Sequence, residues 1–194
     1  MSANAIYNVT QALRERLQQA LQDAMDPGNV FVGPLDDPDA KGASLILFLY
    51  RIAPNPSLRN REHVVVSDNP PPEVIVYDNA LPLVLHYLIT VGTRTATDED
   101  PLLRLLGYAM RTLNDSPDLT GIKVGHETVR VSLEPVSTED MSRIWTLFPT
   151  ANYRTSIAYL ASPVWIDPKN PPVVAGRVTD DRLDAGQRLE PANG

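Results

Sequence analysis

The 194-residue chain is long enough for one domain, or for one domain with an appendage, and such a domain buries about 70% of its extended-chain surface. Hydrophobic residues make up 43% of the chain and charged residues 21%, which excludes wholesale disorder. The formal net charge is −7 and Lys and Arg form no cluster, so the usual electrostatic footprint of a nucleic-acid-binding protein is missing. We therefore expect a folded domain whose partners are neither nucleic acids nor membranes.

The chain has no cysteine, which excludes a disulfide framework, a thiolate metal site and a cysteine nucleophile. Its N-terminal stretch lacks the basic region followed by an apolar region that marks a secretory signal. The longest apolar runs, 43–50 and 81–91, are far shorter than the roughly 20 residues that a membrane-spanning helix needs. These features predict a soluble protein that is made in the cytoplasm.

In the first half of the chain, apolar residues spaced three and four apart predict a helix over 5–25, which "DPGN" then ends. A short strand is expected at 30–33. The stretch 44–52 is apolar on both faces, which is typical of a central strand. The following segment, 53–79, is rich in proline and contains the short β-rich patches "HVVV" and "EVIVY", so we expect a long excursion with an exposed hairpin.

The stretch "LPLVLHYLITVG" (81–92) predicts a strand with one wholly apolar face, while His86 lies on the mixed face. A helix should follow, with Asp100 as its N-cap and Pro101 at its first position. Its apolar stripe consists of Leu102, Leu105, Leu106, Ala109 and Leu113.

Three more elements are predicted after this helix. In the strand 128–136, Val129, Val131 and Leu133 alternate with polar residues. Ser137 and Asp140 form the start of a short helix in the manner of a capping box. The strand 153–166 closes the domain and has one face formed by Tyr153, Ile157, Tyr159 and Ala161.

The order of these elements predicts an α+β domain over residues 1–167, with a mostly antiparallel sheet flanked by helices. Residues 168–194 contain no aromatic side chain and are rich in proline, glycine and charge, which predicts an extended C-terminal arm. Fully extended, such an arm reaches on the order of 90 Å, far enough to cross a neighbouring subunit.

The candidate reagents for catalysis are few. The histidines His63, His86 and His126 lie on separate segments without the spacing of a metal site. We interpret His86 as a strand residue whose ring is hydrogen-bonded or half exposed. A role as a metal ligand or as a catalytic base is the less favoured alternative. Trp145 and Trp165 lie at amphipathic positions that favour the core or an interface over stacking on a ligand.

Two acidic stretches suggest a metal site at first sight. The loop 36–39 hints at calcium, but aligning it with an EF-hand puts Lys41 and Phe48 at ligand positions, so we interpret it as a solvated turn. The acidic cluster 98–100 stands at the start of a predicted helix, where the helix dipole favours negative charge. No metal and no cofactor are therefore expected.

Five segments between residues 85 and 159 match one family pattern in their order and in their residues. They are Leu85, Tyr87, Leu88 and Thr90; "LLGYAM" (105–110) with Leu113; "VSLEPVS" (131–137); Trp145; and "YRTSIAY" (153–159). This succession resembles the cap, or tail-terminator, proteins of extracellular contractile injection systems of the antifeeding-prophage type. "SLILFLYRIAPNPSLRN" (44–60) is also similar to the family's early strand and the loop after it.

The resemblance implies a phage tail-terminator-like fold and a structural protein that is not an enzyme and has no catalytic residue. Such caps form a homohexameric ring on the distal end of the inner tube, contact the last sheath ring and end the polymerisation of both. The protein would then be cytoplasmic during assembly and afterwards part of the contractile particle. Because a six-fold ring needs a heterologous interface, the excursion 53–79 and an exposed sheet edge are candidate contact surfaces.

The arm is a second candidate interface. We expect "PVVAGRV" (172–178) to add a strand to a neighbouring sheath or cap sheet, with exposed ion pairs beside it. The residues of this expected interface are Val173, Val174, Arg177, Val178, Asp180, Asp181 and Arg182.

Two other functions remain open at this point. One is a terminator or completion protein of a true contractile phage tail. The other is a small hydrolase or ligand-binding protein that uses His86 together with Asp98 and Asp100.

Overall fold

The computed structural model describes residues 3–66, 73–92, 99–125, 127–169 and 173–175. Within these ranges the chain forms three α-helices, two short 3₁₀ helices and nine strands. In chain order these elements are α1 (Ala5–Asp23), β1 (Val30–Val32), η1 (Pro38–Ala40), β2 (Leu45–Pro54), β3 (His63–Val66), β4 (Val74–Tyr77), β5 (Leu81–Val91), α2 (Glu99–Asp115), β6 (Asp118–Leu119), η2 (Ile122–Val124), β7 (Val129–Leu133), α3 (Thr138–Trp145), β8 (Ser156–Ile166) and β9 (Val173–Ala175).

Six strands form the main sheet in the order β1-β2-β5-β8-β7-β6. Only the pairing of β1 with β2 is parallel, and the other pairings are antiparallel. The long strand β5 lies between β2 and β8, where neighbours pair with both of its edges. This arrangement confirms the predicted α+β fold with a mostly antiparallel sheet.

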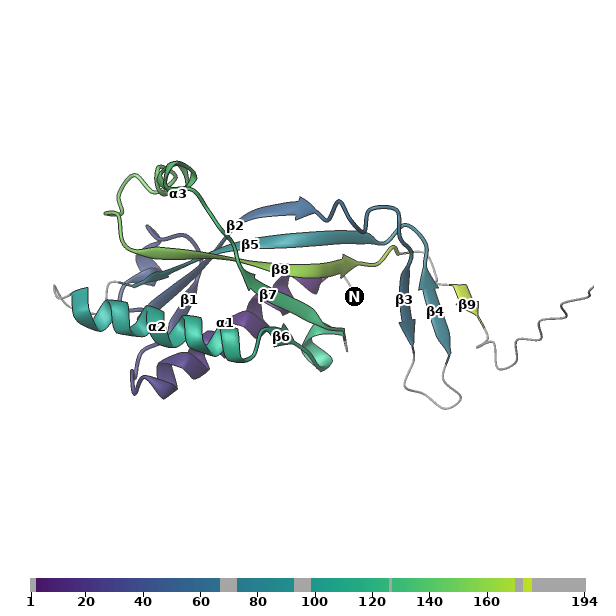
Figure 1. Cartoon of the computed structure of the whole chain (residues 1–194), viewed down its shortest axis with the longest axis horizontal. Helices are drawn as coiled ribbons and strands as arrows, with labels where there is room; N and C mark the ends of the chain where they lie inside the picture. The colour runs from purple at the N-terminus through teal and green to yellow at the C-terminus, as the bar shows by residue number, and fades with distance from the viewer. Residues whose placement is uncertain (1–2, 67–72, 93–98, 126, 170–172, 176–194) are drawn as a thin grey trace, which may run out of the picture.

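Helices α1 and α2 lie along one face of the main sheet (Figure 1). The apolar stripe of α1 and the apolar face of β5 belong to one buried cluster, in which Leu13, Leu85 and Ile89 have no exposed surface. At the centre of this layer the hydroxyl groups of Thr10 and Tyr87 lie 2.8 Å apart. Burial raises the pKa of Tyr87, so its phenol stays protonated and hydrogen-bonded inside the core.

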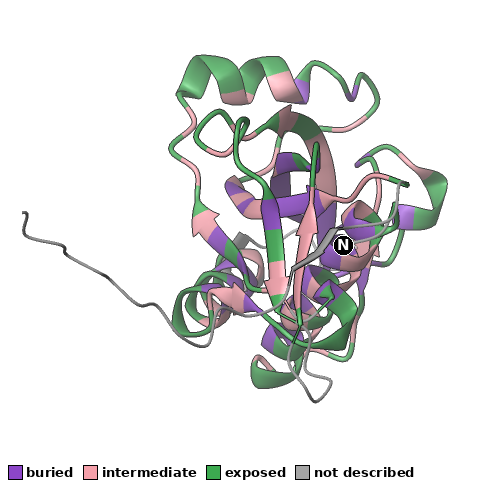
Figure 2. Cartoon of the chain, turned by 90° about the vertical axis from the view of Figure 1, so that its right-hand side faces the viewer, coloured by how far each residue is buried: buried purple, intermediate pink, exposed green. Residues whose placement is uncertain are grey.

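The opposite face of the sheet is covered only in part, by η1 and by the segment around α3. A second, smaller cluster forms there, with Ile46 and Leu88 of the sheet packed against Trp145 and Phe148. The rings of Phe48 and Phe148 meet edge to face at 5.0 Å between centroids. Most of α3 is exposed, as the green helix at the top of Figure 2 shows.

A second sheet projects from the far end of the long strands (Figure 1). It has the order β3-β4-β9, and both of its pairings are antiparallel. Its first two strands are the exposed hairpin predicted within 53–79. Its third strand, β9, lies within the segment that the sequence predicts as an arm. There Val173 pairs with Val76 of β4, and Ala175 pairs with Val74.

Three details of the sequence prediction are corrected. Helix α2 begins at Glu99, so Asp100 and Pro101 lie inside its first turn and Asp100 is not the N-cap; proline is tolerated there because first-turn N–H groups have no partner within the helix. Leu133 is 53% exposed, since β7 ends there near the edge of the sheet. Tyr153 precedes β8 and is 66% exposed, with its ring 5.1 Å from that of Trp145.

Candidate functional site

His86 lies in the middle of β5 and is part of a three-residue polar cluster. Its Nδ1 lies 2.9 Å and 3.0 Å from the two carboxylate oxygens of Glu134, just after β7. The phenol of Tyr50, on β2, donates to the same carboxylate at 2.7 Å. Burial and then this hydrogen bond raise the pKa of Tyr50, so the phenol remains a donor. The prediction of a hydrogen-bonded strand histidine is confirmed, and the cluster joins β2 and β5 to the residue that follows β7.

The hydrolase hypothesis required His86 to act with Asp98 and Asp100. The structure instead gives His86 the carboxylate of Glu134 as its partner. Asp98 lies outside the described residues, and nothing is described of the Asp100 side chain. Sequence reasoning missed this contact, because it predicted Glu134 only as a polar residue of a strand. The contact depends on the order of the sheet, in which only β8 separates β5 from β7.

His63, the first residue of β3, is the centre of a second cluster. Although β3 belongs to the projecting sheet, His63 is only 4% exposed. Its Nδ1 lies 2.7 Å from Oδ1 of Asp167, and its Nε2 lies 3.2 Å from Oε1 of Glu127. Its ring stacks on Trp165 of β8, with 4.6 Å between centroids and 10° between planes. The cluster therefore connects the projecting sheet to the body of the protein.

The remaining sequence candidates that the structure describes lie in turns or in the core. Asp37 caps η1 by accepting a 2.8 Å hydrogen bond from the backbone N–H of Asp39, which agrees with a turn. Across the ranges that the structure describes, no group of three or more His, Asp or Glu side chains is placed to hold a metal ion. His126 lies outside those ranges. Both tryptophans, Trp145 and Trp165, are 7% exposed, which confirms their placement in the core.

A hollow of about 440 Å³ lies between the loop around η1 and the segment after α3. Asp36 and Lys41 line one side of it, and Trp145 and Arg154 line the other. The guanidinium of Arg154 donates to the backbone carbonyl of Gly92 and thereby ties this segment to the end of β5. At least one charged side chain at this hollow, that of Arg154, therefore has a structural role in the fold.

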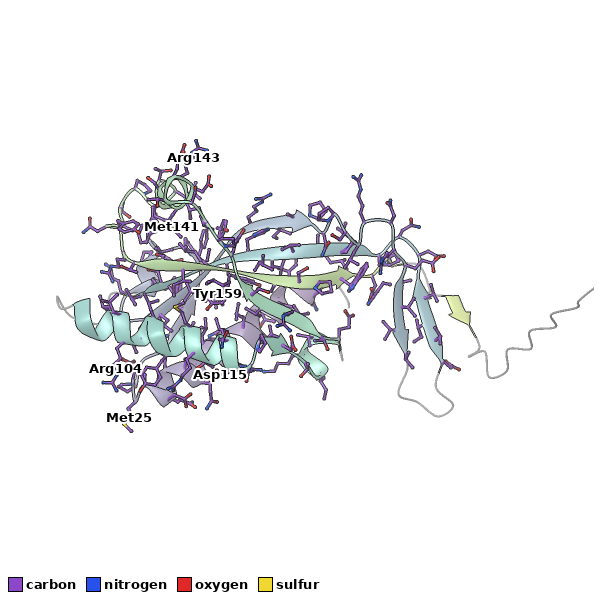
Figure 3. The ribbon with its side chains drawn as sticks, viewed as in Figure 1. Met25, Arg104, Asp115, Met141, Arg143 and Tyr159 are labelled. Atoms are coloured by element: carbon purple, nitrogen blue, oxygen red, sulfur yellow. The ribbon has the colours of Figure 1, made fainter. Side chains whose placement is uncertain are left out.

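The hairpin of the projecting sheet carries an aliphatic face. Val64 pairs with Val76 and Val66 with Val74, and alternation along the strands puts these four side chains on the same side. Val64 is 53% and Val66 is 61% exposed. In Figure 3 the side chains of the body, Tyr159 among them, fill the space between the long strands and the helices, whereas those of β3 and β4 stand apart at the far end. We call Val64, Val66, Val74 and Val76 the valine face.

The predicted arm interface is described only at its beginning. Val173 and Val174 lie in β9, paired with β4 of the same chain. Arg177, Val178, Asp180, Asp181 and Arg182 lie outside the described residues. Contact of these seven residues with a partner stays a prediction. None of the helices in the described part of the chain is both long and apolar enough to cross a membrane.

Comparisons with known proteins place this fold in a class. The sheath/tube terminator of PVC, an extracellular contractile injection system, in its extended state matches with a TM-score of 0.59 and 16% identity over 94% of this chain. The tube-terminating cap of the anti-feeding prophage (AFP) matches with a TM-score of 0.55 and 15% identity over 87% of this chain. The fold is therefore of the tail-terminator and cap class. The chain spans 65% and 58% of the length of those two chains, less than two thirds of each.

The family follows from the sequence match itself. Residues 8–180 match the family model described as the Pvc16 N-terminal domain, and the chain belongs to this family. A comparison with curated proteins gives no match. The resemblance to cap proteins that the sequence motifs indicated is thus confirmed for family and fold.

Proposed function

We propose that the chain is a structural cap, or tail terminator, of a contractile injection system, which ends the polymerisation of the inner tube and the sheath. The observation that carries this proposal is the agreement in fold with the PVC sheath/tube terminator over 94% of the chain. Membership of the Pvc16 N-terminal domain family supports it further. The role is non-enzymatic, in keeping with two histidine clusters whose contacts join strands and segments of the fold.

The cap acts as a ring of six copies that contacts the inner tube and the sheath. It assembles in the cytoplasm and afterwards stays part of the contractile particle. Each copy in a closed ring offers one surface to a different surface of the next copy. The valine face is our candidate for one of these surfaces, because Val64 and Val66 are more than half exposed and exposed aliphatic side chains favour burial against a partner.

The chain beyond β9 is the candidate for sheath contact. Arg177, Asp180, Asp181 and Arg182 supply charges of both signs for ion pairs with a partner, each worth about 0 to 1 kcal/mol in solvent. Val173 and Val174 belong to the same interface, with β9 extending the β3–β4 sheet toward the partner through backbone hydrogen bonds.

Deletion of the gene tests the proposed function directly. We expect particles whose tubes and sheaths vary in length, because nothing ends their growth, as measured by the length distribution in negative-stain electron microscopy. Complementation with the wild-type gene should restore a single length. Deletion particles of normal length with a normal end would contradict the cap function.

A further inference from the structure

His63 joins three segments of the chain that are distant in sequence. It begins β3, whereas Asp167 directly follows β8 and Glu127 precedes β7. Trp165 of β8 stacks on one side of the imidazole, and the ring of Tyr77 on β4 lies 5.7 Å from it at 24°. The imidazole of His63 therefore contacts both the projecting sheet and the body.

Both nitrogens of this imidazole face carboxylates that are largely buried. The Asp167 side chain beside Nδ1 is 12% exposed, and the Glu127 side chain beside Nε2 is 14% exposed. A carboxylate only accepts hydrogen bonds, and a neutral imidazole carries one N–H, so it can donate to one of the two carboxylates and not to both. Both contacts are hydrogen bonds at once only when the ring is an imidazolium.

We propose that His63 is a proton-dependent clasp that fixes the projecting sheet to the body when its ring is charged and loosens it when the ring is neutral. Loss of the proton to solvent leaves a nitrogen lone pair facing a carboxylate oxygen, and one of the two contacts then breaks. The clasp is complete while the ring is an imidazolium and weakens once the ring is neutral.

The other charged and titratable groups around the clasp are few within the described ranges. Lys169 lines the same surface hollow as Tyr77, Glu127 and Asp167, and its positive charge opposes the charged ring. Glu62, next to His63 in the chain, is exposed and therefore screened by solvent. The two buried carboxylates at hydrogen-bond distance dominate, because charge-assisted hydrogen bonds are the stronger interaction.

The substitution Glu127→Gln separates a proton-dependent clasp from a merely structural one. The amide of the glutamine can donate to Nε2 of a neutral His63 while Nδ1–H donates to Asp167, so both contacts survive without the extra proton. This variant should keep the projecting sheet attached at every pH. Glu134→Gln is the matched control, because it makes the same change at the other histidine–glutamate pair, and His86 contacts Glu134 through Nδ1 alone.

The experiment is an NMR measurement on the full chain from about pH 5 to about pH 9, the range in which histidines titrate. It follows the ring signals of His63 together with amide-exchange protection of 64–66 and 74–77, relative to protection in β5 and β8. As His63 loses its proton, protection in the wild type should fall by about tenfold or more, the lower end of the factor for losing one hydrogen bond to a charged group. Protection should stay within about twofold in Glu127→Gln and follow the wild type in Glu134→Gln.

Two results would overturn the clasp. One is a parallel loss of protection in the wild type and in Glu127→Gln; the other is a His63 ring that does not titrate over the measured range. The measurement needs no particle and no ring, so the clasp and the proposed cap function can fail independently.

Discussion

At the scale of single residues, the two buried histidines differ in how many carboxylates they meet. His86 contacts Glu134 through Nδ1, and a neutral ring satisfies this contact. His63 contacts Glu127 and Asp167 through both nitrogens, and only a charged ring satisfies both. The same side chain is therefore a fixed strand connection in β5 and a proposed proton-dependent connection in β3.

Gly92, directly after β5, is a second residue whose neighbours decide its role. Its N–H donates to the carbonyl of Ser44 at 2.9 Å, and a Cβ added to it would overlap the backbone carbonyl of Ala43. We expect Gly92→Ala to lower the free energy of unfolding by about 1–3 kcal/mol, because a rigid backbone has to move. Urea denaturation of the purified chain measures this change.

Gly107→Ala is the matched control for that substitution. Gly107 lies in α2, and an added Cβ would have no heavy atom within 4 Å. Alanine there should raise the free energy of unfolding by about 0.5–1 kcal/mol, the usual gain over glycine inside a helix. Equal effects of the two substitutions would contradict the close approach of Gly92 to Ala43.

At the scale of elements, the projecting sheet differs from the main sheet in how its faces are covered. Strand β5 has helices on one face and part of a second cluster on the other, so its apolar residues are buried within one chain. The hairpin β3–β4 has an equally aliphatic pattern, yet Val64 and Val66 remain more than half exposed. We interpret this difference as a surface that the fold leaves for another subunit.

Charges placed on the valine face should test that interpretation. We expect the double variant Val64→Lys, Val66→Lys to fold normally, because both side chains are exposed, but to produce particles of uncontrolled length, because buried lysines oppose the subunit contact. Lengths are measured by electron microscopy and folding by thermal denaturation.

The control adds the same charge at Met25 and Ile122, which are 90% and 83% exposed and lie outside the hairpin. Particles carrying Met25→Lys and Ile122→Lys should have normal length. The valine-face contact is wrong if the hairpin variant also gives particles of normal length.

At the scale of the whole molecule, the described chain is a body of three α-helices and a long-stranded sheet, with a small sheet at one end (Figure 1). Residues beyond 167 first contribute β9 to that small sheet before the chain continues to its end. A truncation after Asp167 thus removes both β9 and the remainder, whereas a truncation after Ala175 removes only the remainder.

Comparing the two truncations locates the proposed sheath contact. We expect truncation after Ala175 to weaken attachment of the sheath to the capped end while rings still form, because β9 keeps the edge of β4 paired. Truncation after Asp167 should weaken sheath attachment more than ring formation. Co-purification of sheath and cap measures attachment, and equal loss of sheath and rings in both truncations would argue against the arm as a sheath contact.

The sequence by itself determined the main helices and long strands and most of their buried faces. The spacing of apolar residues predicted α1 and the stripe of α2, and alternation predicted which side of β5 faces the core. Ser137 predicted the start of α3, where its side chain accepts from the N–H of Asp140. These features depend on neighbours within a few positions, which local sequence records.

Only the tertiary structure decided which distant side chains meet. Glu127 and Asp167 are 64 and 104 residues away from His63 in the chain, and no local pattern marks either as its partner. Glu134 reaches His86 across β8, which pairs with β5 on one edge and with β7 on the other. Strand β9 pairs with β4 through backbone hydrogen bonds, which composition does not encode. Long-range contacts arise from the topology of the chain, and so the clasp at His63 became visible only in the folded molecule.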